Sequence, residues 1–316
     1  MRTVLEEYSD NPSAFLALNS GNSHFTVPGL DGVITYREAG RRLVQFGGPV
    51  GDPALLAHFT AFARATRRRV VAIQVQADDV PVYEAAGYTV NQVGASYAVD
   101  LARFTLRGKK FVRLRNKIAR ATRSGLIVKE VGQPDWHDRM KALDARWLAA
   151  KGKHTKELEF LVGEYGGAHQ QHRRLFVGTI EGELAGYVSY SPAYGSRPGW
   201  LHDLSRRRPD GPPGVMEAIN STAIDAFRSE GAAWLHFGFT PFTGLAADFD
   251  TRTRSGWFAW LVRQLAARGA AVYPAATQLA YKEKWGPHAV IPEYIAFQGR
   301  ASVYGFLQVF KAANAL

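Results

Sequence analysis

Residues 200–245 alternate between apolar and polar positions in a way that predicts a strand, a loop, a helix and a second strand. The first strand, at 200–204, is short and apolar and carries one acid, Asp203, near its end. Three prolines at 209–214 exclude helix and strand there, because proline lacks a backbone N–H and fixes φ. An apolar face at helical spacing follows, and residues 234–239 form the second strand. A glycine-bearing loop that leads from a strand into a helix points free N–H groups outward, which suits an anion.

The same order of elements appears earlier in the chain. Its patterning predicts strands at 24–27, 32–37, 43–46, 70–75 and 88–93, a tight loop at 47–53, and helices at 13–18, 55–66 and 80–87. Later, residues 175–179 and 183–191 predict a hairpin that leads into the strand at 200–204. The two halves share little sequence identity. We therefore expect two similar α/β lobes with mixed sheets, which is an internal structural repeat.

Between the lobes lies a segment that predicts an amphipathic basic helix. Phe111, Leu114, Ile118 and Ala121 form an apolar line at helical spacing. Residues 107–123 hold eight cations and no acid, namely Arg107, Lys109, Lys110, Arg113, Arg115, Lys117, Arg120 and Arg123. An ordinary solvated helix face is the alternative, but such a face usually carries oppositely charged i,i+4 partners. We favour a surface that binds a polyanion.

The rest of the chain completes the predicted organisation. We expect an amphipathic helix at 134–150 with core aromatics, a helix at 256–268, a strand at 271–274, a helical turn at 279–285 and an apolar tail at 303–310 that packs on the second lobe. The predicted division is an N-terminal lobe at 1–106, a linking helix at 107–125 and a C-terminal lobe at 126–316.

Composition excludes several classes of protein. The 316 residues are 46% hydrophobic and 21% charged, as in a globular protein. No apolar run approaches the roughly 20 residues of a membrane span, and the acidic N-terminus has no signal-peptide core. Cysteine is absent, which rules out disulfides and thiol nucleophiles. A cytoplasmic location is the expectation. The net charge of +11 is concentrated in the basic segment, which points to nucleic acid or an anionic membrane surface.

Few side chains stand out as catalytic candidates. The sequence has no G-x-S-x-G elbow, no H-E-x-x-H pair and no Walker loop. Its histidines are scattered, with His169 and His172 as a close pair on a polar stretch, so we expect no metal site. Asp203 and Arg206 remain. They could form a buried ion pair, but they lie at the C-terminal end of a strand in an α/β lobe, where ligands tend to bind.

Several motifs occur in one order along most of the chain. They are GGPVGDP (47–53), VYEAAGY (82–88), FTLRGKK (104–110), LRNK (114–117), RSG (123–125), WL (147–148), ELEF (157–160), HDLSR (202–206), FGFTPFTGL (237–245) and YKEKWGP (281–287). The lobes resemble the GCN5-related N-acetyltransferase superfamily. The ordered set resembles the C-terminal catalytic domain of the phosphatidylglycerol lysyl/alanyltransferases, a tandem pair of such lobes.

This resemblance implies transfer of an aminoacyl group from aminoacyl-tRNA, with no other cofactor. Asp203 and Arg206 would be catalytic, as the family's D-L-x-R motif, and the basic helix would bind tRNA through Lys109, Lys110, Arg113, Arg115, Lys117, Arg120 and Arg123. The remaining motifs place Glu157, Phe160, Thr240, Lys282 and Lys284 as substrate-binding candidates. The acceptor would be a lipid or a small molecule, with peripheral contact to an anionic membrane. The family's multi-helix membrane domain does not precede these motifs here, which leaves the lipid acceptor open.

Two alternatives remain at this point. An acyl-CoA-dependent N-acyltransferase needs consecutive N–H groups for pyrophosphate, and Pro212 and Pro213 remove two of them. A non-catalytic binder of RNA or of an anionic membrane would need the basic helix but not Asp203.

Overall fold

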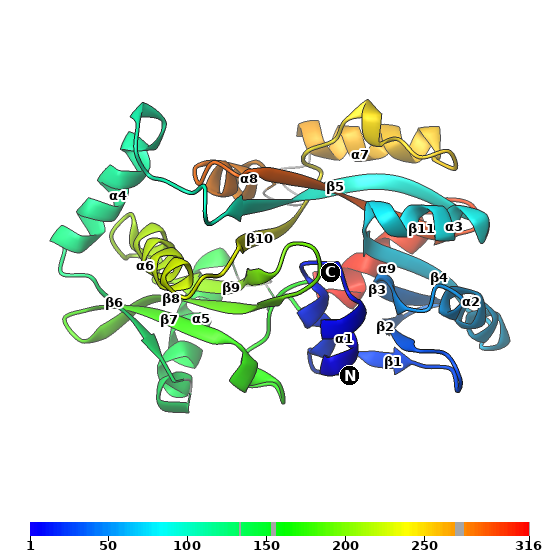
Figure 1. Cartoon of the computed structure of the whole chain (residues 1–316), viewed down its shortest axis with the longest axis horizontal. Coiled ribbons are helices and arrows are strands. Elements are labelled where there is room, and N and C mark those ends of the chain that lie inside the picture. Colours follow the sequence, from blue (N-terminus) through cyan, green and yellow to red (C-terminus); the bar gives the residue numbers. More distant parts are fainter. Residues whose placement is uncertain (133, 153–155, 269–274, 316) are drawn as a thin grey trace.

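A single mixed sheet runs through the whole molecule (Figure 1). The computed structural model describes residues 1–132, 134–152, 156–268 and 275–315. The strands lie in the order β1-β2-β3-β4-β11-β5-β10-β9-β8-β7-β6. Their bounds are Ser23–Phe25 (β1), Gly32–Ala39 (β2), Arg42–Gly51 (β3), Arg69–Val75 (β4), Tyr88–Asp100 (β5), Ile127–Val131 (β6), Arg174–Ile180 (β7), Glu183–Ala193 (β8), Gly199–Arg207 (β9), Trp234–Pro241 (β10) and Ala289–Gln298 (β11). The predicted α/β class with a mixed sheet is confirmed.

Helices connect these strands and cover the sheet. The α-helices are Arg2–Tyr8 (α1), Leu55–Ala65 (α2), Val80–Ala85 (α3), Val112–Arg123 (α4), His137–Lys151 (α5), Val215–Ser229 (α6), Gly256–Arg268 (α7), Ala275–Glu283 (α8) and Val303–Ala312 (α9). Short 3-10 helices include Ala14–Leu18 (η1), Ala77–Asp79 (η2) and Lys109–Phe111 (η3). Among the described residues, no helix combines the length and the apolar character that a membrane span requires.

The two halves of the chain repeat one strand pattern. In the first half, β1, β2 and β3 are antiparallel, and α2 leads into β4, which runs parallel to β3. In the second half, β6 to β9 are antiparallel, and α6 leads into β10, which runs parallel to β9. Figure 1 shows the first half in blue and the second in green and yellow, side by side.

The halves are joined by their last strands. β5 follows β4 in sequence but pairs with β10, whereas β11 follows β10 and α8 but pairs with β4. The two strands also pair antiparallel with each other over residues 88–98 and 289–298. Strand β11, for which the sequence pattern gave no prediction, therefore completes the pairing of β4 and β5. The predicted division into lobes at residues 106 and 125 remains a proposal. The hydrogen bonds of the sheet continue from one half of the chain to the other.

Side chains that alternate along β7 and β8 form two separate cores. Phe176 and Val188 pack with α4 and α6 on one face, whereas Val177 and Tyr187 pack with α5 on the other. This alternation follows from the two-residue period of a strand. The second half thus presents one face with the basic helix α4 and an opposite face with α5.

Two predictions about particular segments differ from the structure. The tail helix α9 packs on β2, β3 and β4 of the first half as well as on Phe242 and Phe258. Its predicted docking on the second lobe therefore describes only part of its packing. Its apolar residues Phe306, Val309 and Ala312 match the core that β3 and β4 line. The predicted loop at 47–53 instead lies largely in β3, where the pairing with β2 shifts register and Gly47 and Gly51 have a positive φ. The predicted strand at 271–274 falls outside the described residues.

Candidate functional site

Strands β9 and β10 separate halfway along their length. Their parallel pairing ends at Leu201 and His236. Beyond that point β9 stays with β8 up to Arg207, while β10 stays with β5 up to Pro241. The break in the sheet therefore falls beside His202 and Asp203, with residues 237–241 on its other side. The break therefore lies in the middle of β9, where its parallel pairing ends, and ligands in α/β folds tend to bind where neighbouring strands part.

Asp203 lies in a buried ion pair, and its partner is Arg173. Arg173 Nε is 3.1 Å from Asp203 Oδ2, and both side chains have zero exposure. The guanidinium also donates to Asn19 Oδ1 at 2.6 Å and lies 5.0 Å from the ring centre of Phe15. The N-terminal segment around η1 thus packs on Arg173 and fixes the geometry of Asp203.

The Asp203 carboxyl is covered from the outside by Gly163. Gly163 N donates to Asp203 O at 3.0 Å, and a Cβ at this glycine would lie 2.5 Å from Asp203 Cγ. Burial raises the pKa of Asp203 above its ordinary value, although Arg173 acts in the opposite direction. Its Oδ1 atom has no hydrogen-bond partner among the described residues. A substrate that touches this carboxyl must displace the backbone at Gly163.

Arg206 lies three residues further along β9 and faces α5. Its guanidinium is 4.0 Å from Asp144, 3.7 Å from Glu157 and 4.3 Å from the ring centre of Trp147. Tyr187 donates to Asp144 at 2.7 Å. Burial raises the pKa of Asp144 above its ordinary value. The predicted pair Asp203 and Arg206 therefore does not interact directly in this structure; each has its own partners.

A cleft of about 690 Å³ opens beside these residues. Its walls include Asp144, Glu157 and Gly163 from the second half and Arg37 from the first half. Four carboxylates line the cleft, namely Asp144, Glu157, Glu159 and Glu164. The cations Arg37 and Lys141 line it as well, as do His137 and Tyr165. Such a cleft has room and polar groups for an amino acid or a small acceptor.

Phe160 lines this cleft with part of its backbone, but its side chain is buried. It has 0% exposure, packs 5.9 Å from Phe46 between ring centres and has Arg37 5.3 Å over its ring. Its φ of +63° is unusual for a residue other than glycine. The position of Phe160 therefore fixes the turn that carries Glu157 and Glu159 along the cleft.

Lys284 and Glu217 form a charged group on the opposite face of the sheet. Lys284 Nζ is 2.7 Å from Glu217 Oε1, and Lys117 of α4 lies 3.5 Å from the same atom. Glu217 begins α6 next to Gly214, whose Cβ, if present, would lie 2.0 Å from Lys117 O. The start of α6 is thus packed against α4, in the position where the sequence predicted an anion site.

Lys282 is buried between α8 and β10. Its Nζ donates to the carbonyl oxygens of Gly238 at 2.6 Å and Phe239 at 3.0 Å, where β10 is bulged. Burial lowers its pKa to about 7, and burial raises that of the nearby Glu293 to about 7. Thr240 is fully buried on the same strand, and its Oγ1 has no partner among the described residues. Lys282 therefore holds the strand that borders the break in the sheet.

The seven cations predicted to bind tRNA are all exposed, and they lie on η3 and α4. Three of them also contact other parts of the protein. Arg115 donates to the carbonyls of Leu106 and Gly108, Lys117 approaches Glu217, and Lys110 lies 5.4 Å from the ring centre of Phe111. The others, Lys109, Arg113, Arg120 and Arg123, leave their charge available to a ligand. Figure 1 places α4 at the far end of the second half, beside α6.

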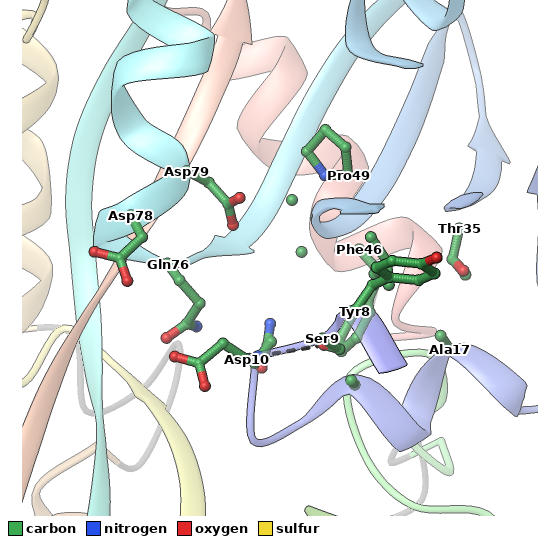
Figure 2. A pocket seen from close by; sticks show the side chains of 15 residues that line it. Tyr8, Ser9, Asp10, Ala17, Thr35, Phe46, Pro49, Gln76, Asp78 and Asp79 are labelled. Atoms are coloured by element: carbon green, nitrogen blue, oxygen red, sulfur yellow. Dashed lines mark hydrogen bonds between the residues drawn. The ribbon is translucent and has the colours of Figure 1, made fainter. Parts of the chain in front are cut away.

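The first half contains a smaller cavity at the equivalent place, where β3 and β4 separate. Its volume is about 110 Å³, and Figure 2 shows Asp10, Asp78, Asp79 and Gln76 around it. The lining residues include no lysine or arginine. Burial raises the pKa of Asp79 to about 6.

Several contributors to the cleft had no signal in the sequence. Arg173, Asp144, Asn19 and Gly163 lie far from Asp203 in the chain, and none belongs to a motif with a chemical spacing. An alignment would be the only sequence source for such residues. The sequence placed Asp203 near the end of a strand at 200–204, but β9 continues to Arg207 because it stays paired with β8. Asp203 therefore lies in the middle of β9, and its partners are tertiary contacts.

Comparisons with known proteins agree with this fold and extend the resemblance. The family described as "Phosphatidylglycerol lysyltransferase, C-terminal" matches residues 2–297. The phosphatidylglycerol lysyltransferase of Bacillus subtilis (strain 168) is 26% identical over 298 residues, which cover 91% of this chain and 33% of that protein. An MprF-like domain protein of Mycobacterium tuberculosis is 24% identical over 242 residues. The aligned part covers 72% of this chain and 50% of that protein. The chain thus spans a third to a half of these relatives.

Solved structures show the same fold. The C-terminal domain of a putative lysylphosphatidylglycerol synthetase from Agrobacterium fabrum has a TM-score of 0.80 and 23% identity, covering 100% of this chain and 96% of that one. The L-PGS structure from Bacillus licheniformis has a TM-score of 0.79 and 21% identity, covering 98% and 94%.

Proposed function

Because the chain belongs to the family of phosphatidylglycerol lysyltransferase C-terminal domains, we propose that it transfers an aminoacyl group from charged tRNA to an acceptor hydroxyl or amine. The observation that carries this proposal is the break between β9 and β10. Lys282 holds β10 at the break through the carbonyls of Gly238 and Phe239. Lys284 and α4 lie on one face of the sheet, and the carboxylate-lined cleft lies on the other. His202 and Asp203 lie at the break, one residue apart.

The donor side is the face with α4. An aminoacyl-tRNA is a polyanion, and its affinity for a protein comes largely from contacts between cations and phosphates. Exposed cations of η3 and α4 supply those contacts. Glu217 of α6 joins this helix to Lys284, since its Oε1 is 2.7 Å from Lys284 Nζ and 3.5 Å from Lys117 Nζ. The aminoacyl ester is already activated, so neither ATP nor a covalent nucleophile is required.

The acceptor side is the cleft. Catalysis then needs positioning, removal of a proton from the acceptor and stabilisation of the oxyanion that forms when the acceptor attacks the ester carbonyl. The bond from the carbonyl carbon to the terminal ribose oxygen of the tRNA then breaks, and that oxygen leaves as a hydroxyl with the proton that the acceptor gave up. We assign the proton or the donor's α-ammonium to Asp203 and the developing negative charge to Arg206. Glu157 would orient an ammonium group, since it lines the cleft 3.7 Å from Arg206.

Phosphatidylglycerol is the acceptor that the names of the relatives indicate, and a small polar molecule is the alternative. An acyl-CoA donor has less support, because α4 occupies the space at the start of α6 where a pyrophosphate would lie and Pro212 and Pro213 lack N–H groups. A cytoplasmic location fits a tRNA donor and is part of the proposal.

The test is a transfer assay with tRNA charged with radiolabelled amino acids, with and without phosphatidylglycerol or a cell extract. We expect acceptor-dependent loss of label from tRNA. Asp203→Asn should lower turnover by about 10² or more, the usual effect of removing a catalytic acid–base group, while tRNA binding survives. Asp225→Asn, at an exposed position of α6, is the matched control and should keep full activity.

Three outcomes would contradict this assignment. Unchanged turnover in Asp203→Asn would remove Asp203 from the mechanism. Transfer from acetyl-CoA without any from charged tRNA would identify the donor as CoA. Binding of tRNA with no transfer to any acceptor would indicate a non-catalytic binder.

A further inference from the structure

Helix α7 presents two tryptophans to solvent. Trp257 is 48% exposed and Trp260 is 59% exposed, although their neighbours Phe258, Ala259 and Val262 are buried on the inner side of the same helix. Exposure of one large apolar side chain is ordinary, but two tryptophans one turn apart on the outer face of one helix form an apolar patch. Tryptophan is also the residue type most favoured at the boundary between water and lipid.

Helix α9 has an outer face of the same kind. Val303, Tyr304 and Leu307 are 50%, 43% and 43% exposed. The two helices are neighbours, because the ring centres of Phe258 and Phe306 lie 5.3 Å apart. Both pack on one core, with α9 over β2 to β4 and α7 against β5. Their outer faces therefore lie on the same side of the sheet.

The two chain segments that carry these apolar side chains contain cations and no acids. Residues 251–268 contain four arginines and no acid, and residues 299–316 contain Arg300 and Lys311 and no acid. Arg252 and Arg254 pair with Glu84 and Asp250. Arg263 and Arg268, on α7 itself, have no ion-pair partner among the described residues. Tryptophans flanked by unpaired arginines complement a surface that is apolar inside and negative outside.

This face is connected to the candidate site through α9. At the C-terminal end of α9, Ala313 O accepts from Glu159 N at 3.1 Å, and Asn314 Nδ2 donates to Glu157 O at 2.9 Å. Those two glutamates line the cleft. A ten-residue helix is about 15 Å long, so the exposed end of α9 lies roughly that far from the cleft wall.

We propose that the outer face of α7, with that of α9 beside it, docks on an anionic lipid bilayer. Trp257 and Trp260 insert at the level of the headgroups, and Arg263 and Arg268 contact lipid phosphates. The biological role of this docking rests on the proposed function. Docking would bring the cleft to a bilayer and thereby favour a lipid as the acceptor of the aminoacyl group.

The experiment is co-sedimentation of the full chain with vesicles of phosphatidylcholine alone and of phosphatidylcholine mixed with phosphatidylserine. Phosphatidylserine serves as an anionic probe so that binding does not depend on any transfer reaction. We expect binding to the mixed vesicles only. The double variant Trp257→Ser/Trp260→Ser should lower the partition coefficient at least about tenfold, because two exposed indoles lose their contact with lipid.

Two further variants make the result specific. Arg263→Glu/Arg268→Glu should weaken binding to the mixed vesicles in a salt-dependent manner and leave the core of α7 intact. Ile127→Ser is the matched apolar control, since Ile127 is 58% exposed on β6 in the other half of the molecule. It should bind like the unchanged protein. Circular dichroism and the midpoint of urea unfolding show whether each variant is folded.

Several results would overturn the proposal. One is an unchanged chain that stays in the supernatant with both vesicle types. Another is normal binding of the tryptophan variant together with loss of binding in Arg113→Glu/Arg120→Glu of α4. If light scattering shows a dimer that the tryptophan variant dissociates, and no vesicle binding, a second copy occupies this face instead. Transfer to a water-miscible acceptor tests the proposed function separately, because the tryptophan variant should retain it. Vesicle binding without any aminoacyl transfer would support the docking surface and refute the proposed function.

Discussion

At the scale of single residues, buried ionisable groups show how the site is held. Arg173 and Asp203 have no exposure, and removing either partner of a buried ion pair leaves an uncompensated charge, which costs about 3–5 kcal/mol. Burial raises the pKa of Asp203 while Arg173 acts in the opposite direction, and a Cβ at Gly163 would lie 2.5 Å from Asp203 Cγ. His202 and His236 are buried as well, and burial lowers their pKa values to about 3 and about 4.

His236 gives a testable pH dependence. Its Nε2 donates to Arg197 O at 2.8 Å, and its folded pKa of about 4 lies below the ordinary 6.5. Below pH 6.5 the unfolded chain takes up a proton that the folded chain does not, so the contribution of His236 to stability is full above 6.5 and is lost as the pH falls toward 4. The quantity to follow is the difference in unfolding free energy between the unchanged protein and His236→Gln. This difference should fall by about 1.4 kcal/mol for each pH unit that the pH is lowered in this window.

The measurement is urea unfolding of both proteins at several pH values between neutral and mildly acidic. The difference between the two proteins removes the contributions of other groups, such as Asp79, whose raised pKa acts in the opposite direction. His58→Gln, at an exposed position of α2, is the matched control for the substitution itself. A constant difference for His236→Gln would mean that His236 is protonated to the same extent in both states.

At the scale of elements, α4 has an inner and an outer role. Leu114 and Ala121 are buried against α6, and Gly214 allows the close contact with Lys117 O, because any side chain there would meet that oxygen. On the outer side, Arg113, Arg120 and Arg123 have no ion-pair partner among the described residues. The amphipathic pattern predicted the helix, and the structure assigns its apolar line to α6.

Replacing Arg113, Arg120 and Arg123 with alanine should lower the affinity for tRNA. It should also make that affinity depend less steeply on salt concentration. Each phosphate contact contributes roughly 0.7–0.9 to the slope of log K against log salt concentration, so the triple variant should lower that slope by about 2. Filter binding over a range of salt concentrations measures it. The triple variant Arg64→Ala/Arg67→Ala/Arg69→Ala removes the same charge from exposed positions of the first half and should leave the slope nearly unchanged. Equal effects of the two triple variants would show that only net charge matters.

At the scale of the whole molecule, the exchange of β5 and β11 makes one cooperative unit. β4 depends on β11 for its second neighbour, and β10 depends on β5. The core of the first half includes Ile295 and Phe297 from β11, close to the C-terminus, together with Phe306 from α9. Neither half therefore completes its sheet or its core from its own consecutive residues.

Ile295→Ala should consequently destabilise both halves equally. Ile295 is fully buried in β11, and removal of such a side chain costs about 2–5 kcal/mol. Hydrogen exchange of the full chain, read at amides of β3 and of β8, should show the same loss of protection free energy at both places. Val290→Ala lies on the same strand at 48% exposure and should change little. A loss confined to β3 would show that the halves unfold independently.

The sequence by itself determined the local elements. Periodicity located α2, α4, α6 and β4 to within a few residues, and the strand with Asp203 and the position of Arg206 followed from the same patterning. These features depend on the period of apolar residues and on glycine and proline, which act over a few neighbouring residues. The family resemblance came from the same short motifs and is confirmed by the match over residues 2–297.

The tertiary structure decided which of these elements meet. It placed β11 between β4 and β5, packed α9 on the first half, paired Asp203 with Arg173, and put Asp203 and Lys284 on opposite faces of one sheet. Each of these contacts joins residues far apart in the chain. A periodic pattern fixes which face of an element is apolar, but several cores offer an apolar surface of the same kind. The partner is chosen only when the whole sheet is assembled and every buried face and charge is satisfied at once.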